Sequence, residues 1–127
     1  MEKKIIKTDN APAPIGPYNQ AVKYGDMLFI SGQVPIDPKT GNVVAGDIQA
    51  ETKQVMNNLK AILSEAGMDF SNVLKTSIFL MDMGQFAQVN EVYGSFFNNE
   101  GAPARETVQV SGLPKGVKVE ISMIAGK

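Results

Sequence analysis

Two charged residues near the C-terminal end of the chain, Arg105 and Glu120, are the first candidates for chemistry. They lie in the stretch GAPARETVQVSGLPKGVKVEISMIAG, where apolar and polar residues alternate on both sides of a loop. This pattern predicts a β-hairpin with Arg105 at its mouth and Glu120 in its second arm. A guanidinium can hold a carboxylate, and a carboxylate can accept a proton. The pair is therefore either the charged part of an active site or an ordinary surface ion pair.

The register of this hairpin determines how far apart the two charges lie. If the valines of both arms face the same core, pairing Val110 with Val117 sets the register. Thr107 then lies opposite Glu120, and Arg105 lies diagonally from Glu120 on the same face, with the two Cα atoms about 7–8 Å apart. Spacing alone favours an exposed ion pair, which is common and contributes at most about 1 kcal/mol.

The rest of the chain must provide the elements that position these residues. Local signals divide the chain into strands and helices. They are a turn at Gly25-Asp26, an N-cap at Asp47, a C-terminal stop at Gly67 and a second cap at Asp82. The predicted elements are strands over 19–24 and 27–33, a helix between Asp47 and Gly67, a strand over 73–81, a helix after Asp82 and the terminal hairpin.

The order ββαβαββ predicts a single α+β domain over residues 1–127, with one mixed sheet and two helices packed on one face. A crossover helix after the second strand, 27–33, implies some parallel pairing of that strand with a right-handed connection. Residues 27–30, MLFI, are apolar on both faces of their predicted strand. Because two helices cover only one face, we expect a partner subunit to cover the other.

Composition excludes several classes of function. The chain has no cysteine and no histidine, which rules out disulfides, Cys/His zinc sites, thiol nucleophiles and Ser–His triads. No EF-hand or Walker spacing occurs, so no metal site is predicted. With 12 basic and 13 acidic residues and no basic block, nucleic-acid binding is not favoured. The N-terminus lacks a signal-peptide pattern and no segment reaches transmembrane length, so we expect a cytoplasmic protein.

Four further residues have an ordinary structural interpretation beside a functional one. Tyr18 fits a hydrophobic cap as well as a ligand contact, and Ser31-Gly32 fits a strand end as well as a binding loop. Asn90 lies inside the second predicted helix, where asparagine usually requires a specific partner. The structural interpretation is therefore weaker for Asn90 than for the other three.

The chain contains three separated segments, IGPYNQAV, LFISGQVPIDPKTG and PARETVQVSGLPKGVKVEI. In sequence and order they resemble the RidA/YjgF family of enamine/imine deaminases. The resemblance covers essentially the whole chain. It implies a chorismate-mutase-like fold and a homotrimer with sites in clefts between subunits. Members of the family hydrolyse reactive 2-aminoacrylate and 2-iminobutanoate, which arise from serine and threonine dehydratases, to 2-oxo acids and ammonia. They use no cofactor.

The resemblance also implies roles for individual residues. Arg105 of the PAR motif would bind the substrate carboxylate, and Glu120 of the VEI motif would position and activate the attacking water. Five other residues would contribute to the pocket. These are Tyr18, Ser31, Gly32, Asn90 and Thr107.

Three positions depart from the family pattern. Thr107 stands where many relatives have cysteine, Ala102 replaces a larger residue, and Ser122 stands where a second glutamate is frequent. Thiol-based redox chemistry is therefore not expected, and the size of the substrate is less well defined than the reaction. Two alternatives stay open: a sensor or holdase-like binder of small metabolites without turnover, and, less favoured by the charge balance, a ribonuclease or translation inhibitor.

Overall fold

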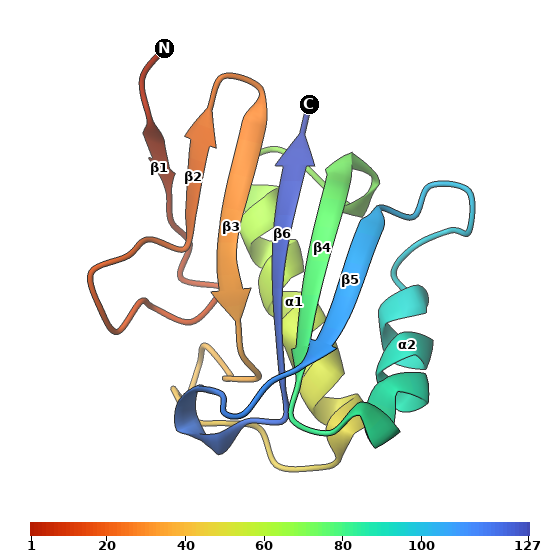
Figure 1. Cartoon of the computed structure of the whole chain (residues 1–127). Coiled ribbons are helices and arrows are strands. Elements are labelled where there is room, and N and C mark those ends of the chain that lie inside the picture. The colour runs from red at the N-terminus through yellow and green to blue at the C-terminus, as the bar shows by residue number, and fades with distance from the viewer.

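A six-stranded mixed sheet forms the centre of the computed structural model, which describes residues 1–127 (Figure 1). The strand order is β1-β2-β3-β6-β4-β5, and every neighbouring pair is antiparallel except β4 and β5. The strands are β1 (Lys4–Ile6), β2 (Ala21–Tyr24), β3 (Met27–Gln33), β4 (Val73–Leu80), β5 (Ala104–Gln109) and β6 (Val119–Gly126), and the helices are α1 (Ile48–Glu65) and α2 (Phe86–Gly94).

The first hairpin is confirmed. Strands β2 and β3 pair in antiparallel fashion up to Tyr24 and Met27, so Gly25 and Asp26 form the two-residue loop. Gly25 adopts a φ of 61°, a left-handed conformation that glycine reaches without a steric penalty. The short strand β1, which pairs with β2 at the sheet edge, was not predicted, because three residues carry too little pattern to be recognised.

The helix between Asp47 and Gly67 is also confirmed. The Asp47 side chain accepts a hydrogen bond of 3.0 Å from the backbone N–H of Ala50, as an N-cap does. The helix ends at its C-cap, Ala66, and Gly67 follows with a φ of 74°. Its apolar stripe packs on the sheet and is fully buried. The stripe includes Ile48, Val55, Leu59 and Ile62.

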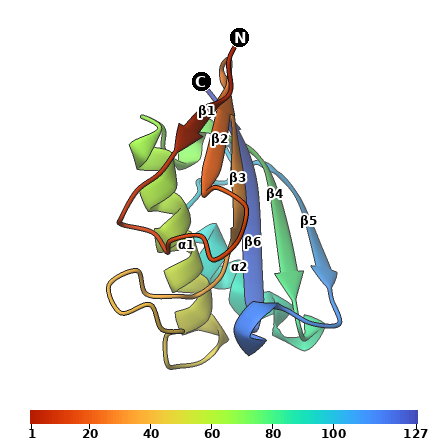
Figure 2. The ribbon, with the colours of Figure 1, turned by 90° about the vertical axis from the view of Figure 1, so that its left-hand side faces the viewer.

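The second helix begins later than predicted. Asp82 caps a short 3-10 turn, Met83–Gln85, by accepting a hydrogen bond from the N–H of Gly84, and α2 starts only at Phe86. Within α2, Val89 and Tyr93 are buried. Both helices lie on the same face of the sheet, as predicted (Figure 2).

The predicted terminal hairpin is wrong, because β5 and β6 are not partners. Strand β6 lies between β3 and β4, and β5 pairs in parallel with β4 at the edge of the sheet. Helix α2 connects β4 to β5, which form the parallel pair of the sheet. The parallel pairing predicted for the second strand, 27–33, is wrong, because both neighbours of β3 are antiparallel to it. Burial explains the arrangement: β6 alternates buried and half-buried residues, as a central strand does, whereas the polar sequence of β5, ARETVQ, suits an edge.

The face of the sheet opposite the helices has no cover within the chain (Figure 2). It carries exposed apolar side chains on four strands, among them Ile5, Tyr24, Phe29 and Val108. We call this surface the open face. Its polar part includes an ion pair of 2.9 Å between Lys75 and Glu106 and a hydrogen bond donated to Glu106 by the Ser77 hydroxyl. No helix has the length and apolar character needed to cross a membrane.

Candidate active site

Arg105 lies on the helix-covered side of β5, where its side chain meets α2. Its Nη1 donates a hydrogen bond of 2.6 Å to Asn90 Oδ1. Its guanidinium carbon also lies 5.5 Å from the ring centroid of Phe86 and 5.1 Å from that of Tyr93. These distances are within the range of cation–π attraction. Because residues 86, 90 and 93 share one side of a helix, α2 holds the guanidinium by two rings and one amide.

No acidic side chain of the chain forms an ion pair with the Arg105 guanidinium. Arg105 is the only arginine of the chain, and neither of the two ion pairs, Lys75–Glu106 and Lys118–Glu51, includes it. Tyr93 donates its hydroxyl to Thr76 Oγ1 at 3.1 Å, and burial raises the pKa of Tyr93, which keeps this ring uncharged. The guanidinium thus faces no competing anion, and its remaining N–H groups can bind a planar carboxylate from outside the chain.

Thr107 lies two residues from Arg105 on the same side of β5, with its backbone opposite Ile78 of β4. Its Oγ1 is buried and has no hydrogen-bond partner. Asn90, Arg105 and Thr107 form one group of predicted residues, which we call the arginine half-site.

Glu120 lies on β6 and points to the open face, beside the end of β3. A Cβ added at Gly32 would come within 2.8 Å of Glu120 Cδ, so the carboxylate occupies space that only a glycine leaves free. Burial raises the pKa of Glu120, and neither ion pair of the chain includes it. A carboxylate that is partly desolvated and unpaired accepts a proton more readily than one in water.

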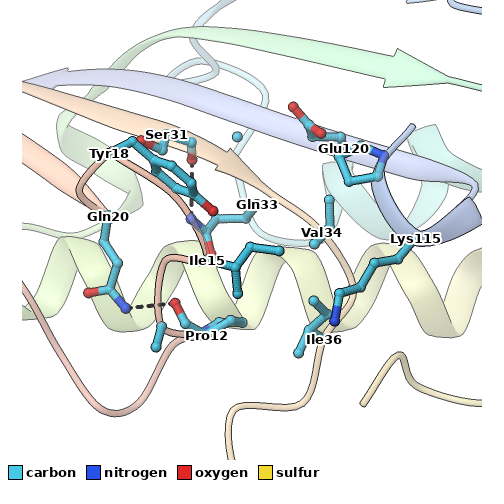
Figure 3. Close-up of a pocket in the computed structure, with 13 residues that line it drawn as sticks. Pro12, Ile15, Tyr18, Gln20, Ser31, Gln33, Val34, Ile36, Lys115 and Glu120 are labelled. Carbon is cyan, nitrogen blue, oxygen red and sulfur yellow. Dashed lines mark hydrogen bonds between the residues drawn. The ribbon is translucent and has the colours of Figure 1, made fainter. Parts of the chain in front are cut away.

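A cavity of about 310 Å³ adjoins this carboxylate (Figure 3). Three other predicted residues, Tyr18, Ser31 and Gly32, line it together with Glu120. Ser31 is fixed by two bonds: its hydroxyl donates to the Asn19 carbonyl at 2.6 Å and its N–H donates to the Gln20 carbonyl at 2.9 Å. Tyr18, Ser31, Gly32 and Glu120 form the second group, which we call the glutamate half-site. No cluster of three or more acidic side chains is placed to hold a metal ion.

The two half-sites lie on opposite faces of the sheet, so the predicted diagonal contact between Arg105 and Glu120 is wrong. Arg105 pairs with Thr76, whose side chain is buried under the helices, whereas Glu120 pairs with Phe79 on the open face. The prediction failed because it assumed that the valines of β5 face the core. Val108 is instead exposed on the open face, and this reverses the direction of its neighbours. The alternative of an Arg105–Glu120 ion pair is wrong for the same reason.

Two aromatic residues that contact Arg105, Phe86 and Tyr93, were not identified from the sequence as site residues. Their spacing from Asn90, four residues before and three after, was the available signal, because it puts both rings on the side of the helix that carries the amide.

The chain is similar to known proteins over nearly its whole length. The family model described as endoribonuclease L-PSP matches residues 8–127. A RutC family protein from Pyrococcus horikoshii is 55% identical over 125 residues, covering 98% of both chains. A 2-iminobutanoate/2-iminopropanoate deaminase from Salmonella typhimurium is 49% identical over 124 residues, covering 96% of both.

The fold also matches a solved structure over nearly its whole length. The crystal structure of E. coli TdcF with bound serine superposes with a TM-score of 0.92 at 45% sequence identity, covering 98% of both chains. Together with the matches above, this similarity shows that the chain belongs to the endoribonuclease L-PSP family, which includes the RutC and RidA proteins.

Proposed function

We propose that this protein is an enamine/imine deaminase that hydrolyses reactive intermediates such as 2-aminoacrylate and 2-iminobutanoate to 2-oxo acids and ammonia. The observation that carries the proposal is a pair of unpartnered charges, each held in a prepared position. These are the guanidinium of Arg105 and the carboxylate of Glu120. The name of the Salmonella relative and the serine bound to TdcF both support a small amino-acid-like substrate.

The complete site then requires two copies of the chain. The sheet separates the half-sites within one chain, so Arg105 of one copy must meet Glu120 of another at a shared substrate. The apolar open face, which no element of the chain covers, supplies a surface for such an assembly. A contact between unlike surfaces forms a ring when its rotation closes, and the family resemblance implies a ring of three.

The reaction follows from the two charges. The fork of Arg105 holds the substrate carboxylate, which fixes the position of the adjacent C2 atom. Glu120 accepts a proton from a water molecule as the water oxygen bonds to C2 of the protonated imine, which gives a carbinolamine. The Glu120 carboxyl group returns this proton to the nitrogen, the C–N bond breaks with release of ammonia, and the oxygen loses its proton to solvent to leave a 2-oxo acid. An enamine substrate must first gain a proton at its terminal carbon to become the imine.

This chemistry requires neither histidine nor cysteine, which the chain lacks. A protonated imine carbon is already electrophilic, so the protein has to position the reactants and move one proton. Positioning alone can lower a barrier by up to about 7–11 kcal/mol. Tyr18, Ser31 and Thr107 complete the proposed pocket around these two groups.

A coupled assay tests the proposal. Threonine dehydratase generates 2-iminobutanoate in situ, and the formation of 2-oxobutanoate is followed with and without the protein. We expect acceleration over spontaneous hydrolysis, loss of that acceleration in Arg105→Ala, and retention in Lys60→Ala, a variant that removes an exposed cation on α1. No acceleration by the unmodified protein would contradict the enzyme and favour a binder without turnover.

A further inference from the structure

We infer that the cavity beside Glu120 is a subsite for an apolar substrate side chain. The inference rests on the proposed function and extends it. It predicts that the preferred substrates are 2-imino acids with uncharged side chains of about three or four carbon atoms, longer than those of the three- and four-carbon imines named above.

The size and lining of the cavity support this assignment. Its volume of about 310 Å³ lies at the lower end of the range for ligand sites, roughly 300–1,000 Å³. At about 30 Å³ for each water-sized group, it has room for roughly ten such groups. Apolar residues from three segments form much of the wall. They are Pro12, Ala13, Ile15, Val34, Ile36 and Pro114.

The lining of the cavity suits the side chain of the substrate better than its carboxylate. Arg105 of the same chain lies on the opposite face of the sheet, and the one cation in the lining, Lys115, is exposed. The interior of the cavity therefore has no group placed to bind the substrate carboxylate. Glu120 belongs to the cavity wall, so the proposed mechanism puts the reacting C2 atom beside Glu120, from where the side chain can extend into the cavity. A methyl side chain would then leave most of the cavity to water, whereas a longer chain would displace that water and bury apolar surface.

One wall of the cavity is fixed by a buried amide. Gln20 is only 2% exposed. Its Nε2 donates to the carbonyls of Thr8, Ala11 and Pro12 at 3.0, 3.2 and 2.9 Å, and its Oε1 accepts from the N–H of Thr8 at 2.7 Å. The segment leading to Ala13 and Ile15 is therefore anchored to Gln20, the residue before β2, before any ligand binds.

Two side chains of α1 fix the remaining walls. Asn58, 1% exposed, donates to the carbonyls of Val34 and Ile36 at 3.1 and 3.0 Å. Glu51, 5% exposed, accepts from the N–H of Lys118 at 2.9 Å and so holds the end of the loop that carries Pro114. Three buried polar side chains thus hold three chain segments around one empty space, which is the arrangement expected of a preformed binding site.

The charged lining residues are consistent with a neutral side chain. Glu120 repels an anionic group near the entrance. Lys115 is exposed, and its chain extends along the cavity past Val34 towards Ile36 (Figure 3). The methylene groups of Lys115 therefore extend the apolar wall while its ammonium can stay in water.

A series of side-chain lengths tests the subsite. An L-amino-acid oxidase generates the 2-imino acids of alanine, 2-aminobutanoate, norvaline and norleucine, and an added amine that traps residual imine reports its hydrolysis. We expect kcat/KM to rise at least about tenfold from the alanine-derived to the norleucine-derived imine, since one methylene in an apolar pocket is worth roughly 10-fold or more. Ala13→Phe, which fills the cavity, should reduce the norleucine/alanine ratio to near one. Ala45→Phe, an exposed alanine outside the cavity, should leave the ratio unchanged.

The outcomes separate this inference from the proposed function. Acceleration of the short imines only, with rates falling as the chain lengthens, would overturn the subsite and leave the deaminase intact. If no imine is accelerated, the deaminase fails, and titration with pyruvate, 2-oxobutanoate, 2-oxopentanoate and 2-oxohexanoate decides the subsite. Affinity that rises with length and is lost in Ala13→Phe would support it, and affinity independent of length would overturn it.

Discussion

Gly32→Ala is expected to remove most of the activity while leaving the fold intact. An added Cβ would lie 2.8 Å from Glu120 Cδ and 3.1 Å from Cγ, whereas ordinary carbon contacts begin near 3.4 Å. The carboxyl carbon must therefore retreat by about 0.6 Å, and the nearer oxygen must move further, because it is the closest atom. A misplacement approaching 1 Å in a catalytic group lowers the rate on the order of 10²-fold. We expect kcat to fall by about that factor.

Stability should respond differently to this substitution. Gly32 has no positive φ, and the atoms it would displace belong to the free end of a side chain. The free energy of unfolding should therefore change by less than about 1 kcal/mol, in either direction. The assay compares kcat on 2-iminobutanoate and denaturant unfolding for Gly32→Ala with those for Gly112→Ala, whose added Cβ would meet nothing within 4 Å. Full activity in Gly32→Ala would refute the role assigned to the Glu120 carboxylate.

Three further substitutions test Glu120, Arg105 and the Asn90 amide that holds Arg105. Glu120→Gln should lose most turnover but still bind 2-oxobutanoate, since the amide fills the same space and cannot accept the proton; a variant as active as the parent would remove Glu120 from the mechanism. Burial raises the folded-state pKa of Glu120, so its ionisation opposes folding above that pKa and has no effect once both states are protonated. Glu120→Gln should therefore raise the free energy of unfolding at about pH 7 but not at about pH 3, as chemical denaturation at both pH values can measure. Arg105→Lys should raise KM at least about tenfold, because an ammonium cannot hold a carboxylate with two parallel bonds; an unchanged KM would contradict the anchor. Asn90→Ala should raise KM by about tenfold with a smaller change in kcat, since a hydrogen bond to a charged group is worth about 1.5–3 kcal/mol; equal losses in both constants would indicate a role in the transition state instead.

The elements with local signals were predictable from the sequence. The Gly25-Asp26 loop, the Asp47 cap and the Gly67 stop each depend on residues within a few positions of one another, and all three are present. The Asp82 cap was also predictable, although the turn that it caps is a 3-10 turn and not the first turn of α2.

The pairing of the last two strands was not predictable from alternation. Alternation identifies a strand and its two faces, but the partner of a strand depends on contacts far along the chain. Here β6 enters between β3 and β4, and β5 is left at the edge. The connection β4-α2-β5 was the usable signal, since two strands joined through a helix commonly lie parallel in one sheet.

The identities of the candidate site residues could be taken from motifs, but their geometry could not. All seven lie in one of two half-sites, yet the half-sites face opposite directions. The assumption that valines point to the core failed at Val108, because the open face is itself apolar. An apolar open face and a divided site have the same explanation under the proposed function, which is a second copy of the chain.

Mixing two inactive variants tests the central claim most directly. Arg105→Ala and Glu120→Gln each remove one half-site, and the two proteins are unfolded together, refolded at equal concentration and assayed on 2-iminobutanoate. If each site takes Arg105 from one copy and Glu120 from the next, about one quarter of the sites in randomly mixed rings are intact, and about one quarter of the parent activity should return. Refolding Arg105→Ala with the double variant Arg105→Ala/Glu120→Gln should restore nothing. No recovery in the first mixture, although mixed assemblies form, would contradict a deaminase site completed by a second copy.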